Sequence, residues 1–319
     1  MQDIQKQLKA IFGDRLKLNE PLAKHLNLRI GGAAQYFCEV QTVEELVHAL
    51  EVIGDTPHVV LGGGSNALAS DEGFDGVVFK LAMRKVEIDG NTVVAEAGAI
   101  SAAVARQTAN AGLAGFTWAI SLPGTIGGAV RGNAGCFGGE MKDTVKMVDV
   151  LHDGKLEQLL AEELGFGYRE STVKHSKDIV LRVYMELPTG DVESLTKELI
   201  NKVEARKASQ PLNAGSAGCI FKNYKIQSNK ELQDLTRKLN VPEAMLSNRR
   251  ISAGWLIDQM GLKGKRIGDA QISEEHGNFF INQGNATANE IVQLIAIVKS
   301  EARERYGIQL QEEVQYLGF

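Results

Sequence analysis

Two glycine-rich stretches are the parts of this sequence whose residue types and spacing point most directly to ligand chemistry. The first is Leu61-Gly62-Gly63-Gly64-Ser65-Asn66, directly after a short β-rich run at residues 58–61. Consecutive glycines let the backbone turn tightly and bring N–H groups within reach of a pyrophosphate, and the Ser65 and Asn66 side chains would add donors. The alternative is a tight turn that binds nothing. The loop is not a P-loop, since no Gly-Lys-Ser/Thr follows, and it lacks the GxGxxG spacing of a Rossmann nucleotide site.

The second stretch contains small residues over a greater length. It runs Pro123-Gly124-Thr125-Ile126-Gly127-Gly128-Ala129-Val130 and continues with Asn133-Ala134-Gly135 and Gly138-Gly139. Such a backbone can lie flat against a large planar ligand, although a glycine-rich packing surface between two elements is the alternative. Because the two stretches are about 60 residues apart and both are flanked by β-rich runs, a cofactor cradle is the better interpretation.

Composition and charge limit the class of protein. The 319 residues are enough for roughly two domains of about 150 residues each, and for a large core without disulfides or a structural metal. The formal net charge of -5 leaves no basic stripe for nucleic acid. Cys38, Cys136 and Cys219 are widely spaced and form no CxxC pair, so we expect neither a metal site nor a disulfide framework.

The N-terminus and the apolar runs bear on the location of the protein. Residues 1–12 are charged and predict a short amphipathic helix without the apolar core of a signal peptide. The longest apolar-rich run, residues 291–298, is too short to span a bilayer. We therefore expect a soluble, cytoplasmic protein without a membrane partner, and the sequence leaves its oligomeric state open.

The elements that must position the glycine stretches follow from hydrophobic periodicity and capping residues. Two predicted helices begin with capping boxes, Thr42 with Glu45 and Thr287 with Glu290, and Ser101 is the expected N-cap of another. Helices are predicted over residues 42–53, 102–111, 191–206, 253–260 and 287–305. Strands are predicted over residues 58–61, 76–80, 92–96, 145–151, 179–187 and 313–317. The polar stretch 224–248 receives no assignment.

The motifs, taken in order, resemble one family. The Gly62 loop followed by Ser70-Asp71-x-Gly73-Phe74 resembles the flavin pyrophosphate loop of the UDP-N-acetylenolpyruvoylglucosamine reductases, and the stretch from Pro123 is similar to that family's second flavin-contacting segment. The remaining matches are Leu28-Arg29-Ile30-Gly31-Gly32, Gly167-Tyr168-Arg169-x-Ser171, Ala217-Gly218-Cys219-x-Phe221-Lys222-Asn223, Gly261-Leu262-Lys263-Gly264, His276-x-Asn278-Phe279 and Leu310-x-x-Glu313-Val314. Any single match is weak, but the ordered set spans almost the whole chain and is specific.

The resemblance implies an α+β fold. It consists of an FAD-binding domain of the vanillyl-alcohol oxidase (PCMH) type and a smaller α+β substrate-binding domain. We accordingly expect an FAD-binding region at residues 1–203, with subdomains at about 1–58 and 59–203, a substrate-binding domain at 204–306, and a C-terminal strand at 307–319 that carries a catalytic Glu. The short stretch 179–206 leaves no room for the long tyrosine-bearing loop of one subclass, so the chain resembles the compact second subclass.

The resemblance also implies a reaction. In the family, NADPH reduces non-covalently bound FAD, which passes hydride to the enolpyruvyl group of UDP-N-acetylglucosamine enolpyruvate and yields UDP-N-acetylmuramate, a peptidoglycan precursor. By position, the implied cofactor-binding residues are Gly62, Gly63, Gly64, Ser65, Asn66, Pro123, Gly124, Thr125, Gly127, Gly128, Asn133, Ala134 and Gly135. The implied substrate-binding residues are Tyr168, Arg206, Lys222, Asn223 and Asn278.

Arg169, Cys219 and Glu313 take the catalytic positions in this resemblance. Hydride addition to an enol ether puts negative charge on the carbon that bears the carboxylate, which needs cationic stabilisation and then a proton. Arg169 can hold a carboxylate at two points. Cys219 stands where the family usually has a serine proton donor, and a thiol with a reference pKa of ~8.5 can donate at neutral pH. Glu313 would hydrogen-bond near the enolate or relay the proton, and the Leu310-x-x-Glu-Val spacing favours it over Glu312.

Other interpretations remain open at this point. Arg169 can be an ordinary surface arginine, and Cys219 a small buried hydrophobe. Departures from the family pattern at Leu26-Asn27 and Thr117 leave flavin contacts there open. One rival function is an oxidase of the same fold that acts on a sugar or alcohol and attaches FAD covalently, for which Cys136 is the available residue. The other is a non-catalytic nucleotide-sugar binding module.

Overall fold

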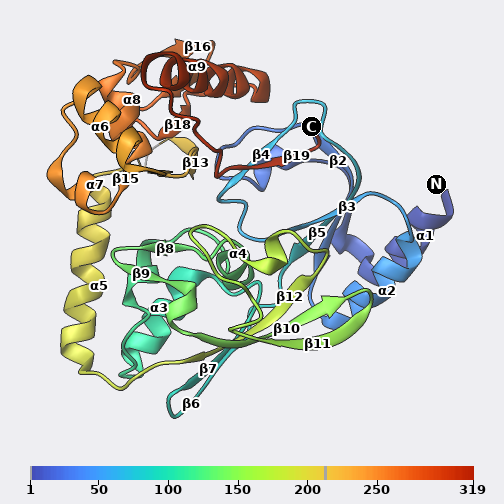
Figure 1. The fold of residues 1–319 in the computed structure, drawn as a ribbon. Coiled ribbons are helices and arrows are strands. Elements are labelled where there is room, and N and C mark those ends of the chain that lie inside the picture. Colours follow the sequence, from blue (N-terminus) through green and yellow to red (C-terminus); the bar gives the residue numbers. More distant parts are fainter. Residues whose placement is uncertain (1, 212–213) are drawn as a thin grey trace. The chain divides into compact units, whose positions relative to one another are not determined.

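The computed structural model describes residues 2–211 and 214–319 (Figure 1). These residues form two compact units, and both units are discontinuous in sequence. Unit 1 contains the described residues up to Glu20 together with Ala33–Gly64 and Phe74–Ala208. Unit 2 contains Pro21–Gly32, Ser65–Gly73 and the described residues from Ser209 to Phe319. Each unit has a hydrophobic core of its own.

A four-stranded sheet in unit 1 is built around parallel strands. Its order is β1 (Leu16–Pro21), β2 (Ala33–Val40), β5 (Phe74–Leu81) and β3 (His58–Leu61). Strand β5 lies between β2 and β3 and runs parallel to both, and the helix α2 (Val43–Ile53) makes the crossover from β2 to β3 that parallel strands require. Helix α1 (Gln2–Phe12) contacts α2, and Phe12 packs against Phe79 of β5, with ring centroids 6.5 Å apart.

The second sheet of unit 1 is antiparallel. Its five strands lie in the order β11 (Lys155–Leu160), β10 (Val145–His152), β12 (Ile179–Glu186), β7 (Thr92–Glu96) and β6 (Val86–Asp89). Arg182 and Glu186 of β12 are exposed while the apolar residues between them are mostly buried, so the strand has one wet face, as its alternation predicts. Unit 1 is completed by α3 (Ser101–Asn110), η3 (Thr117–Ser121), α4 (Ile126–Arg131), the hairpin of β8 (Gly135–Cys136) and β9 (Gly139–Glu140), and α5 (Val192–Lys207).

Unit 2 is built on a four-stranded sheet with the order β13 (Gly215–Cys219), β18 (Phe279–Asn282), β17 (Ala270–Ile272) and β16 (Arg266–Ile267). Helices α8 (Ala253–Gln259) and α9 (Ala288–Tyr306) supply buried side chains to its core. Two short pairings accompany the sheet: β14 (Tyr224–Lys225) with β15 (Arg250–Ile251), and β4 (Ala67–Ala69) with β19 (Gln315–Leu317). The remaining helices are α6 (Asn229–Lys238) and α7 (Glu243–Ser247).

The two capping boxes differ in the structure. At α9 both hydrogen bonds between Thr287 and Glu290 are present, as predicted. At α2 the Thr42 hydroxyl accepts from the Glu45 N–H at 3.2 Å. The Glu45 carboxylate does not close the box, because it accepts from the Gln41 N–H and from the Arg15 guanidinium instead. The helix begins where the sequence predicts in both cases, because the Thr cap alone satisfies one of its first donors.

Two local expectations are wrong. Ser101 is not the N-cap of α3, because Ile100 holds that position and Ser101 is a fully buried first helical residue. The C-terminal strand does not carry Glu313, because β19 begins at Gln315. The stretch without an assignment, 224–248, contains β14, α6 and α7, and its longest helix, α6, fully buries Leu235 alone. One buried position gives too little periodicity for a sequence-based assignment.

The sequence-based division at 203/204 and 306/307 stays a prediction. In the division into compact units, the boundary between unit 1 and unit 2 lies between Ala208 and Ser209, and residues 307–319 belong to unit 2. Two early segments, Pro21–Gly32 and Ser65–Gly73, also belong to unit 2. Strand β4 pairs in parallel with β19, so a segment from the first quarter of the chain is held by the last residues.

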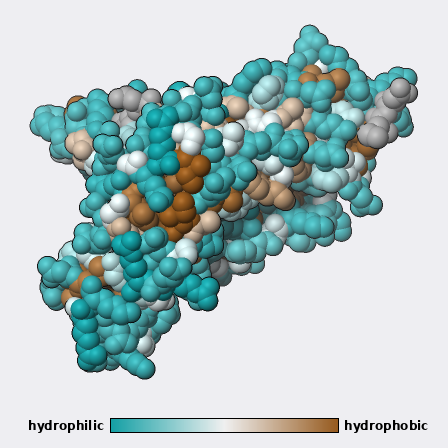
Figure 2. All heavy atoms as spheres, turned by 90° about the horizontal axis from the view of Figure 1, so that it is seen from above, coloured by the Kyte–Doolittle hydropathy of each residue, from teal (hydrophilic) through white to brown (hydrophobic). Residues whose placement is uncertain are grey.

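The surface is largely polar. The face in Figure 2 is mostly hydrophilic, with hydrophobic residues in small areas. No helix among the described residues is long and apolar enough to cross a membrane. Within residues 2–211 and 214–319, no group of three His, Cys, Asp or Glu side chains is placed to hold a metal ion.

Candidate active site

The two glycine-rich stretches lie against each other within unit 1. A Cβ atom built on Gly63 would be 2.4 Å from the Gly124 Cα, and one built on Gly62 would be 2.7 Å from Thr125 Oγ1. Both distances are shorter than real Cβ contacts. A side chain at Gly63 would meet backbone and cannot be accommodated in this arrangement, whereas one at Gly62 would require the Thr125 hydroxyl to move. Gly64 and Gly124 have φ angles of 66° and 109°, a region that favours glycine. These glycines therefore serve at least the close packing of one stretch on the other.

Gly128 differs from its neighbour Gly127 in the second stretch, and it has no positive φ that would favour glycine. It is exposed, and a Cβ atom there would meet only Thr125 Oγ1, at an ordinary 3.6 Å. At the neighbouring Gly127, by contrast, a Cβ atom would lie 2.7 Å from the Ala97 Cβ. Packing among the described residues thus explains glycine at 127 but not at 128, where the close approach of a flat ligand does explain it.

Buried polar atoms mark the same region. Four side-chain atoms there have no hydrogen-bond partner among the described residues: Ser101 Oγ, Trp118 Nε1, Ser121 Oγ and Thr125 Oγ1. The Ser101 N–H donates to the Gly124 carbonyl at 3.1 Å, which places Ser101 beside the second stretch. Because buried polar groups are nearly always paired, these atoms indicate a ligand with donors and acceptors of its own. The ring edge, ribityl hydroxyls and pyrophosphate of FAD fit this requirement.

The Asn133–Gly135 part of the second stretch is committed to internal contacts. Asn133 is fully buried, and its amide donates to the Gly167 carbonyl at 2.8 Å and to the Glu140 carboxylate at 2.9 Å. The Ala134 N–H donates to the Ala129 carbonyl, and the Ala134 carbonyl accepts from the Met141 N–H. A cofactor contact from Asn133 would therefore come from its backbone, while its side chain fixes the loop that precedes Tyr168.

Arg169 lies in a tight turn of unit 1. Gly167 and Glu170 exchange both backbone hydrogen bonds, at 3.0 and 3.2 Å, and Arg169 between them has a left-handed φ of 59°. Its guanidinium donates to the Gly135 carbonyl at 2.7 Å and lies 5.0 Å from the centre of the Tyr168 ring. A left-handed conformation is uncommon for a residue with a long side chain and marks functional sites. Arg169 is half-buried and held in one direction, unlike an ordinary surface arginine.

Arg206 and Cys136 belong to the same neighbourhood of unit 1. Burial raises the pKa of the Cys136 thiol, and the positive charges of Arg206, Arg169 and Lys202 oppose that shift. The thiol donates to the Trp118 carbonyl at 3.2 Å. Arg206 lies in the last turn of α5. Because the charges of Arg206 and Arg169 both act on Cys136, the two predicted anion-binding side chains lie in one neighbourhood. A neutral, hydrogen-bonded Cys136 is a poor nucleophile, which argues against covalent flavin attachment there.

Cys219 lies at a bulge of unit 2. The pairing of β13 with β18 shifts between Ser216 and Cys219, and Gly218 has a φ of 76°. The Gly218 N–H donates to Ser216 Oγ at 3.2 Å. Bulges re-aim a side chain and are frequent next to active sites. Cys219 is half-buried, so the alternative of a fully buried small hydrophobe is not what the structure shows.

Glu313 is brought beside Cys219 by backbone pairing within unit 2. Its N–H donates to the carbonyl of Ile220 at 2.7 Å. The Glu313 carbonyl in turn accepts from Asn66 Nδ2 at 3.0 Å, and Asn66 Oδ1 is buried without a partner among the described residues. The competing Glu312 forms an ion pair with Lys299 at 2.8 Å. Glu313 therefore remains the better candidate.

The predicted substrate residues of unit 2 are engaged in different ways. Asn278 is 2% exposed, and both ends of its amide pair with the Phe221 backbone, at 2.9 and 2.8 Å. Asn223 Oδ1 accepts from the Ala253 N–H at 3.1 Å, at the start of α8. Lys222 is half-buried, and its N–H donates to the Gln311 carbonyl at 2.9 Å. Asn278 thus holds the segment after Cys219 in place, and the burial of its side chain leaves little access for substrate.

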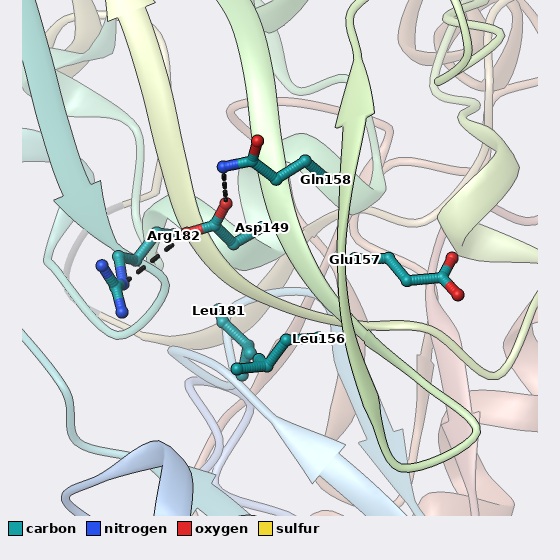
Figure 3. A pocket seen from close by; sticks show the side chains of 6 residues that line it. All are labelled: Asp149, Leu156, Glu157, Gln158, Leu181 and Arg182. Carbon is teal, nitrogen blue, oxygen red and sulfur yellow. Dashed lines mark hydrogen bonds and ion pairs between the residues drawn. The ribbon is translucent and has the colours of Figure 1, made fainter.

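A pocket of about 210 Å³ on the five-stranded sheet is a poor candidate for the active site. It is lined by Asp149, Leu156, Glu157, Gln158, Leu181 and Arg182. Figure 3 shows Gln158 and Arg182 directed at Asp149, whereas Glu157 points away. Asp149 also accepts from the Tyr184 hydroxyl at 2.9 Å, so the polar groups satisfy one another across β10, β11 and β12. None of the predicted catalytic or cofactor residues lines it.

The sequence alone does not reveal several residues near the glycine-rich stretches and Arg169. Ser121 and Trp118 carry no motif that marks them, and Ser101 was interpreted as a helix cap. The Lys174 ammonium group donates to the Arg169 carbonyl. The matched Gly-Tyr-Arg-x-Ser motif ends before Lys174 and therefore does not indicate it. Their roles depend on burial and long-range contacts that no local pattern encodes.

Known families account for this architecture. An FAD binding domain matches residues 34–159, which include both glycine-rich stretches. Together with the α+β fold and the paired glycines, this match defines the chain as an FAD-dependent oxidoreductase. The C-terminal domain of UDP-N-acetylenolpyruvoylglucosamine reductase matches residues 210–317.

Full-length relatives are more specific. The UDP-N-acetylenolpyruvoylglucosamine reductase of Alkaliphilus oremlandii is 36% identical over 97% of this chain and 96% of its own length. The UDP-N-acetylenolpyruvoylglucosamine reductase 2 of Symbiobacterium thermophilum is also 36% identical, over 100% of this chain and 98% of its own length. The crystal structure of the Thermus caldophilus UDP-N-acetylenolpyruvylglucosamine reductase is 36% identical, covers 95% of this chain and 98% of that chain, and gives a TM-score of 0.76. The chain belongs to the UDP-N-acetylenolpyruvoylglucosamine reductase family, and the predicted family and fold class are confirmed.

Proposed function

We propose that this protein is a cytoplasmic enzyme that reduces UDP-N-acetylglucosamine enolpyruvate to UDP-N-acetylmuramate with NADPH, in peptidoglycan precursor synthesis. The observation that carries the proposal is full-length similarity to named reductases combined with chemically apt residues at the catalytic positions, Arg169, Cys219 and Glu313. A binding module would not need an arginine, a thiol and a carboxylate together at these three positions.

The residues that would hold FAD are those of the two packed glycine stretches, with Ser101 and Thr125 as additional partners. When bound, FAD supplies a carrier that accepts hydride from NADPH and delivers it to the enolpyruvyl group. Thr125 Oγ1 lies between Gly62 and Gly128 and is available to donate to a phosphate or hydroxyl oxygen. The exposed Gly128 leaves a flat backbone surface beside it.

Arg169 acts on the substrate carboxylate in this proposal. Hydride addition leaves negative charge on the carbon that bears the carboxylate, and a fixed guanidinium stabilises that charge before and during its formation. The Gly135 carbonyl and the Tyr168 ring hold the guanidinium, so little reorganisation is needed when substrate binds. Tyr168, Arg206 and Lys222 remain proposed substrate contacts.

Cys219 donates the proton that completes the reaction. Its thiol is half-buried at the bulge, and a backbone hydrogen bond joins Glu313 to Ile220, the residue after Cys219, which supports a role for Glu313 at the same segment. The Glu313 carboxyl group can orient the thiol by hydrogen bonding, or take up a proton from solvent and pass it to the thiolate after each turnover. Asn278 and Asn223 fix the backbone on either side of Lys222 rather than contacting substrate through their side-chain amides.

The test of the reaction is anaerobic stopped-flow of the purified holoenzyme. NADPH should bleach the flavin, and subsequent addition of enolpyruvyl UDP-N-acetylglucosamine should restore its colour with formation of UDP-N-acetylmuramate. Bleaching without reoxidation by that substrate would contradict the proposal and leave the oxidase alternative. Acid precipitation then distinguishes attachment, since non-covalent flavin stays in the supernatant and flavin bound to Cys136 would not.

The cofactor site is tested separately by Gly128→Val. A Cβ atom fits the protein at this position, and the valine side chain would fill the surface proposed for FAD, so the purified variant should keep its fold and contain little flavin by absorbance. Gly132→Ala is the matched control, because its Cβ would meet only the Gly128 carbonyl, at 3.8 Å. Full flavin occupancy in Gly128→Val would contradict the assignment. Gly63 is unsuitable for this test, since any side chain there disrupts the packing of the two stretches.

A further inference from the structure

The conformation of Arg169 needs support from outside its own turn. A left-handed φ of 59° is disfavoured for arginine, because the Cβ atom crowds the backbone. The two hydrogen bonds between Gly167 and Glu170 close the turn but are compatible with other backbone angles at its tip. A contact to the Arg169 peptide itself is required to fix its side-chain direction.

Lys174 supplies that contact. Its Nζ donates to the Arg169 carbonyl at 2.8 Å, and only 10% of the side chain is exposed. The same ammonium group lies 3.6 Å from the Glu170 carboxylate. The short η5 (Thr172–Lys174) brings the lysine back over the turn. A mostly buried ammonium on a backbone carbonyl is an uncommon use of lysine, because burial of its charge is costly unless its partners are fixed.

The turn is also fixed at its other end. Asn133, fully buried, donates to the Gly167 carbonyl at 2.8 Å. The guanidinium of Arg169 meets the Gly135 carbonyl, two residues further along the same stretch. If the Arg169 peptide rotated toward an ordinary negative φ, the Cα–Cβ direction would change and the guanidinium would leave the Gly135 carbonyl.

We infer that Lys174 is a positioning residue that holds Arg169 in its left-handed conformation and so aims the guanidinium. This inference rests on the proposed role of Arg169 for its kinetic consequence, and on the hydrogen bond and the φ angle for its structural one. Lys174 acts through Arg169 and contacts no reacting atom. The competing interpretation is that Lys174 only neutralises Glu170.

A double-mutant cycle on the holoenzyme tests the kinetic consequence. Lys174→Met should keep FAD and flavin reduction by NADPH but slow reoxidation by the enolpyruvyl substrate about tenfold or more, as expected when a fixed charged group is displaced by an ångström. In an Arg169→Lys background the same change should add less than about twofold, since the group that it positions is already lost. Lys174→Arg, which can donate to the same carbonyl, should restore most of the rate.

Chemical labelling tests the structural consequence without reference to the reaction. Phenylglyoxal should modify Arg169 faster in Lys174→Met than in the wild type, as mapped by mass spectrometry. Two controls are Lys177→Met, which removes an exposed lysine three residues away, and Glu170→Gln, which removes the carboxylate that pairs with Lys174 and His175 but keeps the hydrogen bond from Lys174 to the Arg169 carbonyl. Both should leave the labelling rate unchanged.

The outcomes separate the inference from the proposed function. The inference would be overturned if the factors by which Lys174→Met and Arg169→Lys each slow reoxidation multiplied in full in the double variant. It would also be overturned if phenylglyoxal labelled Arg169 equally fast in Lys174→Met and in the wild type. An equal effect of Glu170→Gln would assign Lys174 to charge neutralisation. If Arg169→Lys leaves reoxidation undiminished, the proposed role of Arg169 fails, and the labelling rates alone then decide whether Lys174 positions that side chain.

Discussion

The turn that carries Arg169 and the strand that carries Cys219 both contain a left-handed residue, with φ of 59° at Arg169 and 76° at Gly218. They are stabilised differently. The partners of the Arg169 turn are side chains, Asn133 and Lys174, one of them only five residues away. The Cys219 segment is held mainly by backbone pairing with β18 and with the C-terminal segment, far along the chain.

This difference affects how each site responds to mutation. In the turn the strained residue is itself the functional one, so a change of a supporting side chain is expected to move the guanidinium directly. In the strand a glycine takes the left-handed angle at no steric cost, and the functional residue follows it. The first site should therefore lose activity without losing stability, and the second should lose both together when its pairing is broken.

The largest expected effect is at the thiol itself. Cys219→Ala should slow reoxidation of reduced flavin by about 10²–10⁴, the usual contribution of general-acid catalysis, while reduction by NADPH is unchanged. Cys219→Ser should keep substantial activity, because a hydroxyl can also donate. Stopped-flow of both half-reactions measures this, and a fully active alanine variant would return Cys219 to a packing role.

Arg169→Lys is expected to come next. Lysine keeps the charge but loses the planar two-point grip and the geometry that places the guanidinium on the Gly135 carbonyl. Reoxidation should slow by about 10² or more, the scale of one lost oxyanion donor. Thermal denaturation should be nearly unchanged, because the Lys174 contact is to the backbone. A large loss of stability with no loss of rate would reverse the comparison between the two sites.

Asn278→Ala should have its main effect on stability. The change leaves the N–H and carbonyl of Phe221 buried without partners, and each such group costs about 1–3 kcal/mol. The denaturant midpoint should fall and the proton-transfer step should slow with it, since Phe221 lies two residues after Cys219. Asn240→Ala, at an exposed position, is the control. Unchanged stability with raised KM for the UDP-sugar would restore Asn278 as a substrate contact.

The smallest expected effect concerns pH. Burial lowers the pKa of His276 in the folded protein, where its Nδ1 accepts from the Asn278 N–H at 3.2 Å. Below the ordinary histidine pKa of 6.5 the unfolded chain binds a proton that the folded chain does not, so stability is complete above that pH and declines as the pH falls. One such group changes stability by at most about 1.4 kcal/mol per pH unit.

Denaturation curves at several pH values between 7.5 and 5.5, roughly the range around the histidine reference pKa, measure this dependence. His276→Gln should flatten it. An identical pH dependence in the wild type and the variant would show that other groups determine it. Arg169→Lys should show the wild-type dependence, because the turn of unit 1 does not contain this histidine.

Much of this architecture could be predicted where the determinants are local. Thr287 with Glu290, and Asp191 before α5, begin helices where the sequence predicts because a cap needs only residues three positions apart. The ordered motifs also identified the family. The assignment of the individual site residues stays a prediction.

The remainder depends on contacts between distant residues. Asn278 resembles a substrate ligand in a motif, but its amide is used by Phe221, 57 residues away in sequence. Serine is a common N-cap residue, yet Ser101 is a buried residue of the first helical turn and its N–H donates to the Gly124 carbonyl. Gly63 has a loop signature that predicts pyrophosphate contacts, whereas its Cβ position is already blocked by Gly124. Side-chain identity alone does not distinguish these cases.

The parallel pairing of β4 with β19 has a consequence for biosynthesis. The segment around Leu68 is synthesised long before its strand partner, Gln315–Leu317, which lies far along the chain. Until then β4 presents unpaired backbone groups, and an unpaired strand edge is a template for association with other chains. A nascent or truncated chain without Gln315–Leu317 thus lacks the partner of this strand, and completion of unit 2 must follow synthesis of those residues.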